Sequence, residues 1–182
     1  MRHVVRETAV EVRREIEATL IPSGAKVTLQ PGSQVFVTQA LGNSYTLYVN
    51  GNLVRIAGKD GDAIGLVVLD SPDINEIEGS IEDKVWTQLR TCFDPEIPVN
   101  IVDLGLVYEC NILPLGKHEN SVHITMTLTA AGCGMGPVLL ADVEEKIRQI
   151  HHVTDVKVEL VFDPPWTREM MSDEAKLQLG LL

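Results

Sequence analysis

The sequence predicts an α+β protein made of a small β-rich N-terminal domain followed by a two-layer α-β-β-α-β sandwich. Residues 26–69 contain short runs rich in β-branched residues, separated by turn residues, whereas the chain beyond residue 80 alternates helical and strand-like periods. A polar stretch with a proline and no sustained period lies between them. We therefore expect a boundary at 70–78, with domains at 1–75 and 78–182.

Short strands separated by turns predict a β-meander or barrel for the N-terminal part. The expected strands are Lys26–Gln30, Gln34–Leu41, Tyr45–Val49, Leu53–Ala57 and Leu66–Leu69. Asn50-Gly51, between two apolar runs, is the strongest hairpin signal, because both residue types accept the positive φ of a two-residue turn. The apolar residues of segment 2–19 are mostly β-branched and do not all fit one helical face, so this segment stays unassigned.

Helices and strands alternate in the predicted C-terminal domain. In chain order we expect a helix over 80–91, strands over 106–112 and 121–129, a helix from Pro137, a strand over 153–162 and a short helix from Ser172. In the first helix Ile81, Val85 and Leu89 lie on one face. The first two strands are expected to be joined by a polar turn that contains Pro114 and Gly116.

Charge and motif content exclude several classes of function. The chain of 182 residues has 15 Lys and Arg against 26 Asp and Glu, a net charge of −11, which disfavours nucleic acid and anionic membranes as partners. No apolar run approaches the roughly 18 residues of a membrane span, and the charged start has no signal-peptide core, so a cytoplasmic location is expected. ATP, NAD and zinc-hydrolase motifs are absent.

Cys133 is the candidate reactive group. It lies in the run Gly132-Cys-Gly-Met-Gly136, where a strand is expected to give way to a helix. Glycines permit a tight turn, and a helix start favours the thiolate, the form that attacks electrophiles or binds iron. The alternative is a buried cysteine in a tight turn, which the flanking glycines make the weaker interpretation.

The other two cysteines are expected to pack in the core. Cys92 extends the apolar stripe of the first helix, and Cys110 lies on a strand face with Leu106 and Tyr108. Three cysteines cannot ligate a four-cysteine centre. Any metal site must therefore be incomplete, use other ligand types or be shared with a second chain.

An acidic loop around two prolines precedes the first strand of this domain. It carries Asp94, Glu96 and Asp103, and the prolines stiffen it. These carboxylates either support the thiol or act as hard ligands, or else they cap turns by accepting backbone N–H groups, and the sequence leaves both interpretations open. Trp166, after two prolines, either lines a cleft or covers the core.

Four motifs in order carry a family resemblance. They are Asp94-Pro95-Glu96, Asp103-Leu-Gly-Leu-Val-Tyr108, Thr127-Leu-Thr129 leading to Cys133, and Asp163-Pro-Pro-Trp166. Over residues 78–181 the chain resembles the domain shared by cytosolic iron-sulfur targeting factors and the PaaD accessory protein. The glycine-rich run ending in Pro137, together with Met170-Met171-Ser172, is similar to the SufT-like branch, whose β-rich front half resembles 37–42 and 55–60 here.

The resemblance implies a non-enzymatic maturation factor that helps to deliver iron-sulfur clusters to client apoproteins. It makes Cys133 the metal ligand and Asp94 and Glu96 the acidic turn, and Asp103, Thr127 and Thr129 complete the expected surroundings. The expected cargo is a transient iron-sulfur cluster or iron, not held stably by one chain. The expected partners are the assembly machinery, client apoproteins and, as an option, a second copy. The rivals are a thiol enzyme and a client adaptor that never binds iron.

Overall fold

The computed structural model describes residues 9–69, 71–94, 97–132 and 134–182. The chain divides into two compact units, Met1–Ser71 and Pro72–Leu182, and each has its own apolar core. Sheets and helices occur together along the chain, so the predicted α+β class is confirmed. Within the described ranges, no helix is both long and apolar enough to cross a membrane.

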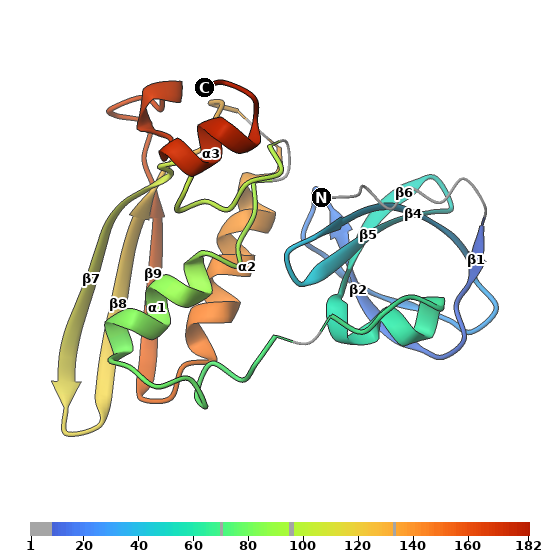
Figure 1. Ribbon diagram of the computed structural model, residues 1–182. Helices are drawn as coiled ribbons and strands as arrows, with labels where there is room; N and C mark the ends of the chain where they lie inside the picture. The colour runs from blue at the N-terminus through green and yellow to red at the C-terminus, as the bar shows by residue number, and fades with distance from the viewer. Residues whose placement is uncertain (1–8, 70, 95–96, 133) are drawn as a thin grey trace. The chain divides into compact units, whose positions relative to one another are not determined.

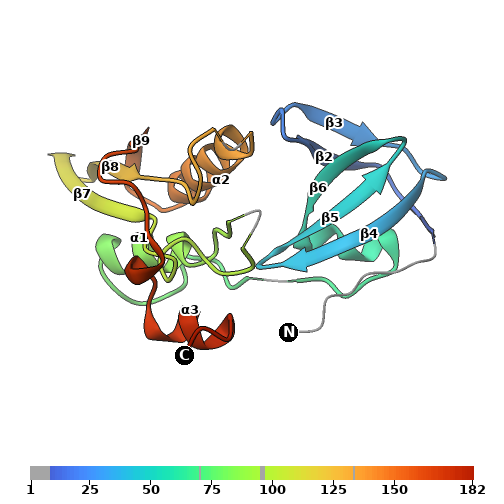
Figure 2. The same ribbon diagram turned by 90° about the horizontal axis from the view of Figure 1, so that it is seen from above.

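Six antiparallel strands form the sheet of the first unit, in the order β1-β4-β5-β6-β2-β3. They are β1 (Val10–Glu11), β2 (Ile16–Ile21), β3 (Lys26–Leu29), β4 (Gln34–Leu41), β5 (Ser44–Val49) and β6 (Asn52–Ala57), followed by the 3-10 helix η1 (Gly58–Ile64). Figure 2 shows β4, β5 and β6 running side by side in a curved sheet. Alternate residues such as Val35, Val37 and Leu47 are buried, which gives the sheet one apolar face.

The strands predicted between residues 26 and 57 are confirmed, with ends that move by no more than one residue. Asn50 and Gly51 have φ values of 48° and 83°, as the hairpin prediction requires. The unassigned arm contains β2, which pairs with both β3 and β6.

The predicted strand Leu66–Leu69 is wrong, because this segment folds back on η1 instead of joining a sheet. Leu66 N–H donates to the Gly61 carbonyl at 2.9 Å, and Leu69 N–H donates to the Gly58 carbonyl at 3.0 Å. Its apolar residues are partly exposed, Val67 at 75%.

The second unit contains the predicted order of helices and strands. Its elements are α1 (Ile81–Leu89), β7 (Val107–Gly116), β8 (Glu119–Met126), α2 (Gly136–Arg148), β9 (Val153–Leu160), the 3-10 helix η2 (Arg168–Met170) and α3 (Asp173–Gln178). The sheet order is β7-β8-β9, with β7 antiparallel and β9 parallel to the central β8 (Figure 1). Ser80 caps α1 through a reciprocal capping box with Asp83.

Strand boundaries differ from the sequence prediction at the β7–β8 hairpin, at the end of β8 and at the end of β9, which is Leu160 instead of residue 162. Pro114 lies inside β7, opposite Asn120, because the hairpin turn comes later, at residues 117–118. The second strand ends at Met126 and not at Thr129, because Thr127 N–H donates to the Leu106 carbonyl, outside the ladder.

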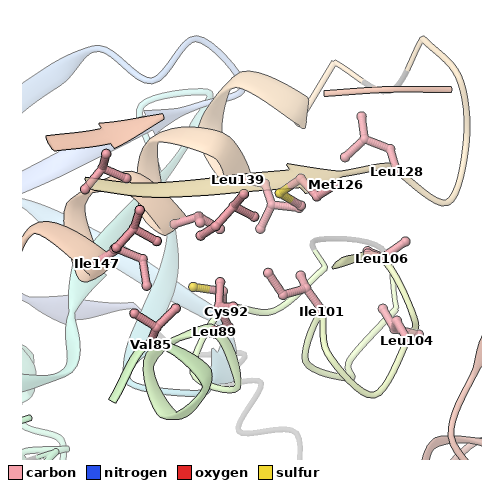
Figure 3. Packing of buried hydrophobic residues seen from close by; sticks show 14 of the residues in the cluster. Val85, Leu89, Cys92, Ile101, Leu104, Leu106, Met126, Leu128, Leu139 and Ile147 are labelled. Atoms are coloured by element: carbon pink, nitrogen blue, oxygen red, sulfur yellow. The ribbon is translucent and has the colours of Figure 1, made fainter. Parts of the chain in front are cut away.

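One face of the β7-β8-β9 sheet packs on α1 and α2. On β8, Val122, Ile124 and Met126 are at most 1% exposed. Figure 3 shows Val85 and Leu89 of α1 on one side of this core and Met126 on the other. The helices therefore cover the apolar face of the sheet.

We expect limited proteolysis to separate the two units at the exposed residues 71–73, just before the buried Ile74. The released fragment, about residues 74–182, contains a complete core, so its urea unfolding should be a single cooperative transition by circular dichroism. First cuts inside β7, β8 or α2, or a fragment that unfolds without a cooperative transition, would contradict two self-sufficient units.

Candidate functional site

Described residues of the second, third and fourth motif segments meet at one end of the sheet of the second unit. Val107, Met126 and Leu160 are in register, so β7 begins where β8 and β9 end. The loops before β7, after β8 and after β9 therefore all lie at this end, next to α3 (Figure 1). Segments separated by up to about 70 positions in the sequence become neighbours here.

Hydrogen bonds tie these loops to one another. The Trp166 Nε1–H donates to the Leu104 carbonyl at 2.7 Å. The Tyr108 hydroxyl donates to the Pro164 carbonyl, also at 2.7 Å. The Thr127 N–H donates to the carbonyl of Leu106, the residue before β7, at 2.8 Å. These bonds join the loops before β7, after β8 and after β9 into one structure, which we call the loop end. Most of the acceptors in it are backbone carbonyls.

Gly105 shows why the second motif contains a glycine. Its φ is +74°, and a Cβ at this position would collide with the Met170 carbonyl oxygen. Next to it, Ser172 N–H donates to the Asp103 carbonyl at 2.8 Å. This glycine lets the loop before β7 lie directly against the segment that leads into α3.

Cys133 lies outside the described residues, as does Glu96, so the roles predicted for them stay predictions. The described neighbours Gly132 and Gly134 are both exposed, and α2 begins at Gly136. Gly132 has a φ of +82°, with nothing within 4 Å of where a Cβ would lie. Position 132 therefore favours glycine because of its backbone conformation, since a side chain there would have room.

Asp94 is a buried carboxylate that shapes its own loop. It is 3% exposed, and its Oδ1 accepts the Ile97 N–H at 2.9 Å. Its own N–H donates to the Val99 carbonyl at 3.3 Å. The turn-capping interpretation is therefore confirmed for Asp94, while a further contribution beside the thiol stays a prediction.

Asp103 is held by a residue that the sequence prediction missed. The Asn100 Nδ2 donates to Asp103 Oδ2 at 2.6 Å, and Asn100 Oδ1 accepts the N–H groups of Val102 and Asp103 at 3.1 and 3.0 Å. An asparagine after a proline-rich turn is a typical signal for such bonding. Asp103 is half-buried, Thr127 is 1% exposed and Thr129 is half-buried, so these predicted site residues mainly build the loop end.

Cys92 and Cys110 pack as expected. Cys92 is fully buried in the core, and its thiol lies 3.6 Å from the Gln88 carbonyl. Cys110 is partly buried against the same core, and burial raises its pKa to about 11, with a smaller contribution from the charge of Glu82. The Cys110 thiol is therefore protonated near neutral pH, and the Cys92 thiol is enclosed in the core.

Trp166 covers the core at the loop end. Its ring packs on the apolar cluster while its N–H makes the bond to Leu104 described above. Across the described ranges, no three His, Cys, Asp or Glu side chains gather as a metal-binding group.

Comparisons with known proteins agree with the resemblance given by the motifs. The family described as "Iron-sulfur cluster assembly protein" matches residues 82–160. A "Fe-S protein maturation auxiliary factor" of Porphyromonas gingivalis is 43% identical over 101 residues, 56% of this chain and 92% of that protein.

Two further relatives carry similar names. The "Fe-S protein maturation auxiliary factor YitW" of Bacillus subtilis is 37% identical and shares 58% of this chain and 99% of its own length. The "Fe-S protein maturation auxiliary factor SufT" of Staphylococcus aureus is 42% identical and shares 48% of this chain and 96% of its own length. The similarity to the SufT-like branch is thereby confirmed.

We expect Asp94→Ala to lower the free energy of unfolding by about 1–3 kcal/mol, because the Ile97 N–H loses its buried acceptor. Asp94→Asn keeps an oxygen at that position and should lose less. Urea unfolding measures both, with the exposed Glu109→Ala as a control expected within about 0.5 kcal/mol of wild type. Equal stability of Asp94→Ala and wild type would show that this bond does not hold the loop.

We expect Cys133 to be alkylated first by iodoacetamide at neutral pH. Cys92 should react only on unfolding, and Cys110 should react slowly but about tenfold faster per pH unit from pH 7 to 9, because its raised pKa keeps it protonated. Mass mapping of short reactions measures the order. Early labelling of Cys110 in the folded protein would overturn the assignment of the reactive thiol.

Proposed function

The chain belongs to the iron-sulfur cluster assembly protein family, and on this premise we propose that it helps to deliver iron-sulfur clusters to client apoproteins through Cys133. Three relatives, each matched over more than nine-tenths of its own length, are named Fe-S protein maturation auxiliary factors. The observation that carries the proposal is that described residues of the second, third and fourth motif segments lie together at one end of the sheet, where Trp166 bonds to Leu104 and where β7 begins and β8 ends.

The chemistry of the cysteines supports a transient carrier. Iron in clusters prefers soft thiolate ligands. Cys92 is buried and Cys110 has a raised pKa, which leaves Cys133 as the one thiol suited to the task. A single thiolate completes only part of a cluster's ligand set, so the cluster is cargo shared with a client, the assembly machinery or a second copy of the chain.

In this proposal the acidic and hydroxyl residues shape the loops around the thiol and do not bind the cluster. The Asp94 carboxylate accepts the backbone N–H of Ile97, and the Asp103 carboxylate accepts the side-chain amide of Asn100. Both residues lie in the loop before β7, whose Leu106 carbonyl accepts the N–H of Thr127 at the end of β8. Thr127 and Thr129 then connect β8 to the segment that contains the thiol, and the family resemblance assigns Glu96 to the same acidic motif as Asp94.

A thiol enzyme is disfavoured by the positions of the histidines. Such an enzyme needs a general base within hydrogen-bond reach of the nucleophile. Among the described residues, His118, His151 and His152 lie in turns at the opposite end of the sheet, and His123 lies inside β8. We therefore propose a non-enzymatic role in the cytoplasm, with the assembly machinery and client apoproteins as partners.

We expect Cys133→Ser to abolish maturation of a cluster-dependent client enzyme while leaving the melting temperature unchanged. Oxygen replaces sulfur with little change in volume, but the soft ligand is lost. Client activity in cells that lack the native protein measures the first effect, and thermal unfolding of the purified variant measures the second.

Cys92→Ser is the matched control for this experiment. It places a hydroxyl in the apolar core and should lower stability by about 1–3 kcal/mol, with delivery retained in the molecules that fold. A fully active Cys133→Ser variant would remove this cysteine from the mechanism and favour an adaptor that binds clients without iron.

A further inference from the structure

We propose that His118 and His152 form a chelating site for a divalent transition metal ion, with Zn²⁺ as the test ion. The two residues lie in different turns, His118 between β7 and β8 and His152 between α2 and β9. Both are exposed, at the end of the sheet opposite the motif segments. The site is thus separate from Cys133 and independent of the proposed delivery function.

Backbone hydrogen bonds hold the two turns together. Asn120, two residues after His118, donates to the His152 carbonyl from its N–H at 2.8 Å and from its Nδ2 at 3.1 Å. On the other side, His151 N–H donates to the Asn75 Oδ1 at 2.8 Å. The two turns that carry the imidazoles are therefore held side by side by the fold.

His152 has an unusual backbone conformation. Its φ is +68°, a region that is uncommon for residues other than glycine, although histidine enters it more often than most. The double hydrogen bond from Asn120 to its carbonyl holds this conformation. This conformation brings the imidazole of His152 beside that of His118.

The separation of the rings fits two ligands of one metal ion. Their centroids are 5.4 Å apart, with the planes tilted by 39°. With Zn–N bonds of about 2.0–2.1 Å and tetrahedral angles, two imidazoles on one ion have centroids about 5 Å apart. The ring of His151 is farther from that of His152, at 6.4 Å. Two protein ligands leave the remaining coordination positions to water.

The surroundings favour a cation. Among the described residues, neither the His118 nor the His152 imidazole has a hydrogen-bond or ion-pair partner, so no existing bond must break. The chain as a whole carries a net charge of −11, which attracts cations, and next to His118 the charges of Lys117 and Glu119 offset each other. Neutral imidazole is a preferred ligand of borderline ions such as Zn²⁺.

The test is calorimetric titration of the full-length chain with Zn²⁺ at pH 7.5, in a Cys133→Ser background that removes the competing soft ligand. We expect one ion per chain, and His118→Gln and His152→Asn should each weaken binding by about tenfold or more. Asparagine is chosen at 152 because it tolerates positive φ, so the turn is retained. Acidification to pH 5.5 should release the metal, because protons compete for the same nitrogens.

His123→Gln is the matched control, since it removes an exposed histidine from the same sheet, with its ring 4.0 Å from the Asp155 carboxylate. It should leave Zn²⁺ binding unchanged. Absence of saturable binding, unchanged affinity in both turn variants, or an equal loss in His123→Gln would overturn the proposal. Equal melting temperatures of the metal-free variants establish that any loss of binding is local.

Discussion

Burial of one face of the β7-β8-β9 sheet is the constraint on which the rest of the second unit depends. Val122, Ile124 and Met126 of the central strand are almost completely enclosed, and each such side chain contributes about 1.5–3 kcal/mol on burial. A one-residue slip of β8 would turn all three to solvent, so the register is fixed. Because the register is fixed, the start of β7 and the ends of β8 and β9 coincide, and the described residues of three motif segments are brought together.

At the loop end of the sheet, the oxygen and nitrogen groups have a different role from the thiol. Carboxylates and amides such as Asp94, Asp103 and Asn100 accept or donate hydrogen bonds that shape the loops. Gly105 permits the close approach of the loop before β7 to the segment that leads into α3. The proposed function assigns the thiolate chemistry to the glycine-flanked Cys133, while the other two thiols pack against the core. In the proposed function, the loops position one thiolate for a transient iron-sulfur cluster, and the partner supplies the remaining ligands.

Local patterns predicted most elements, and contacts between distant residues explain what they missed. Alternation identified β4 to β9, and Asn50-Gly51 identified its turn, since these signals are contained within a few residues. The Leu66–Leu69 segment has strand composition, yet its backbone bonds return to η1, which composition cannot reveal. The motifs marked Asp94 and Asp103 in the loop before β7, but only the register shows that this loop starts β7 at the end of the sheet where β8 and β9 finish. His118 and His152 lie 34 positions apart, so their proximity was invisible in the sequence.

The most direct test of the delivery account is anaerobic reconstitution of the full-length protein with iron and sulfide, followed by visible absorption spectroscopy. The account predicts charge-transfer absorption that is lost in Cys133→Ser and retained in Cys110→Ser, since only one of these thiols is a ligand. Absence of visible absorption in the wild-type protein, or equal absorption in Cys133→Ser, would contradict a cysteine-bound cargo.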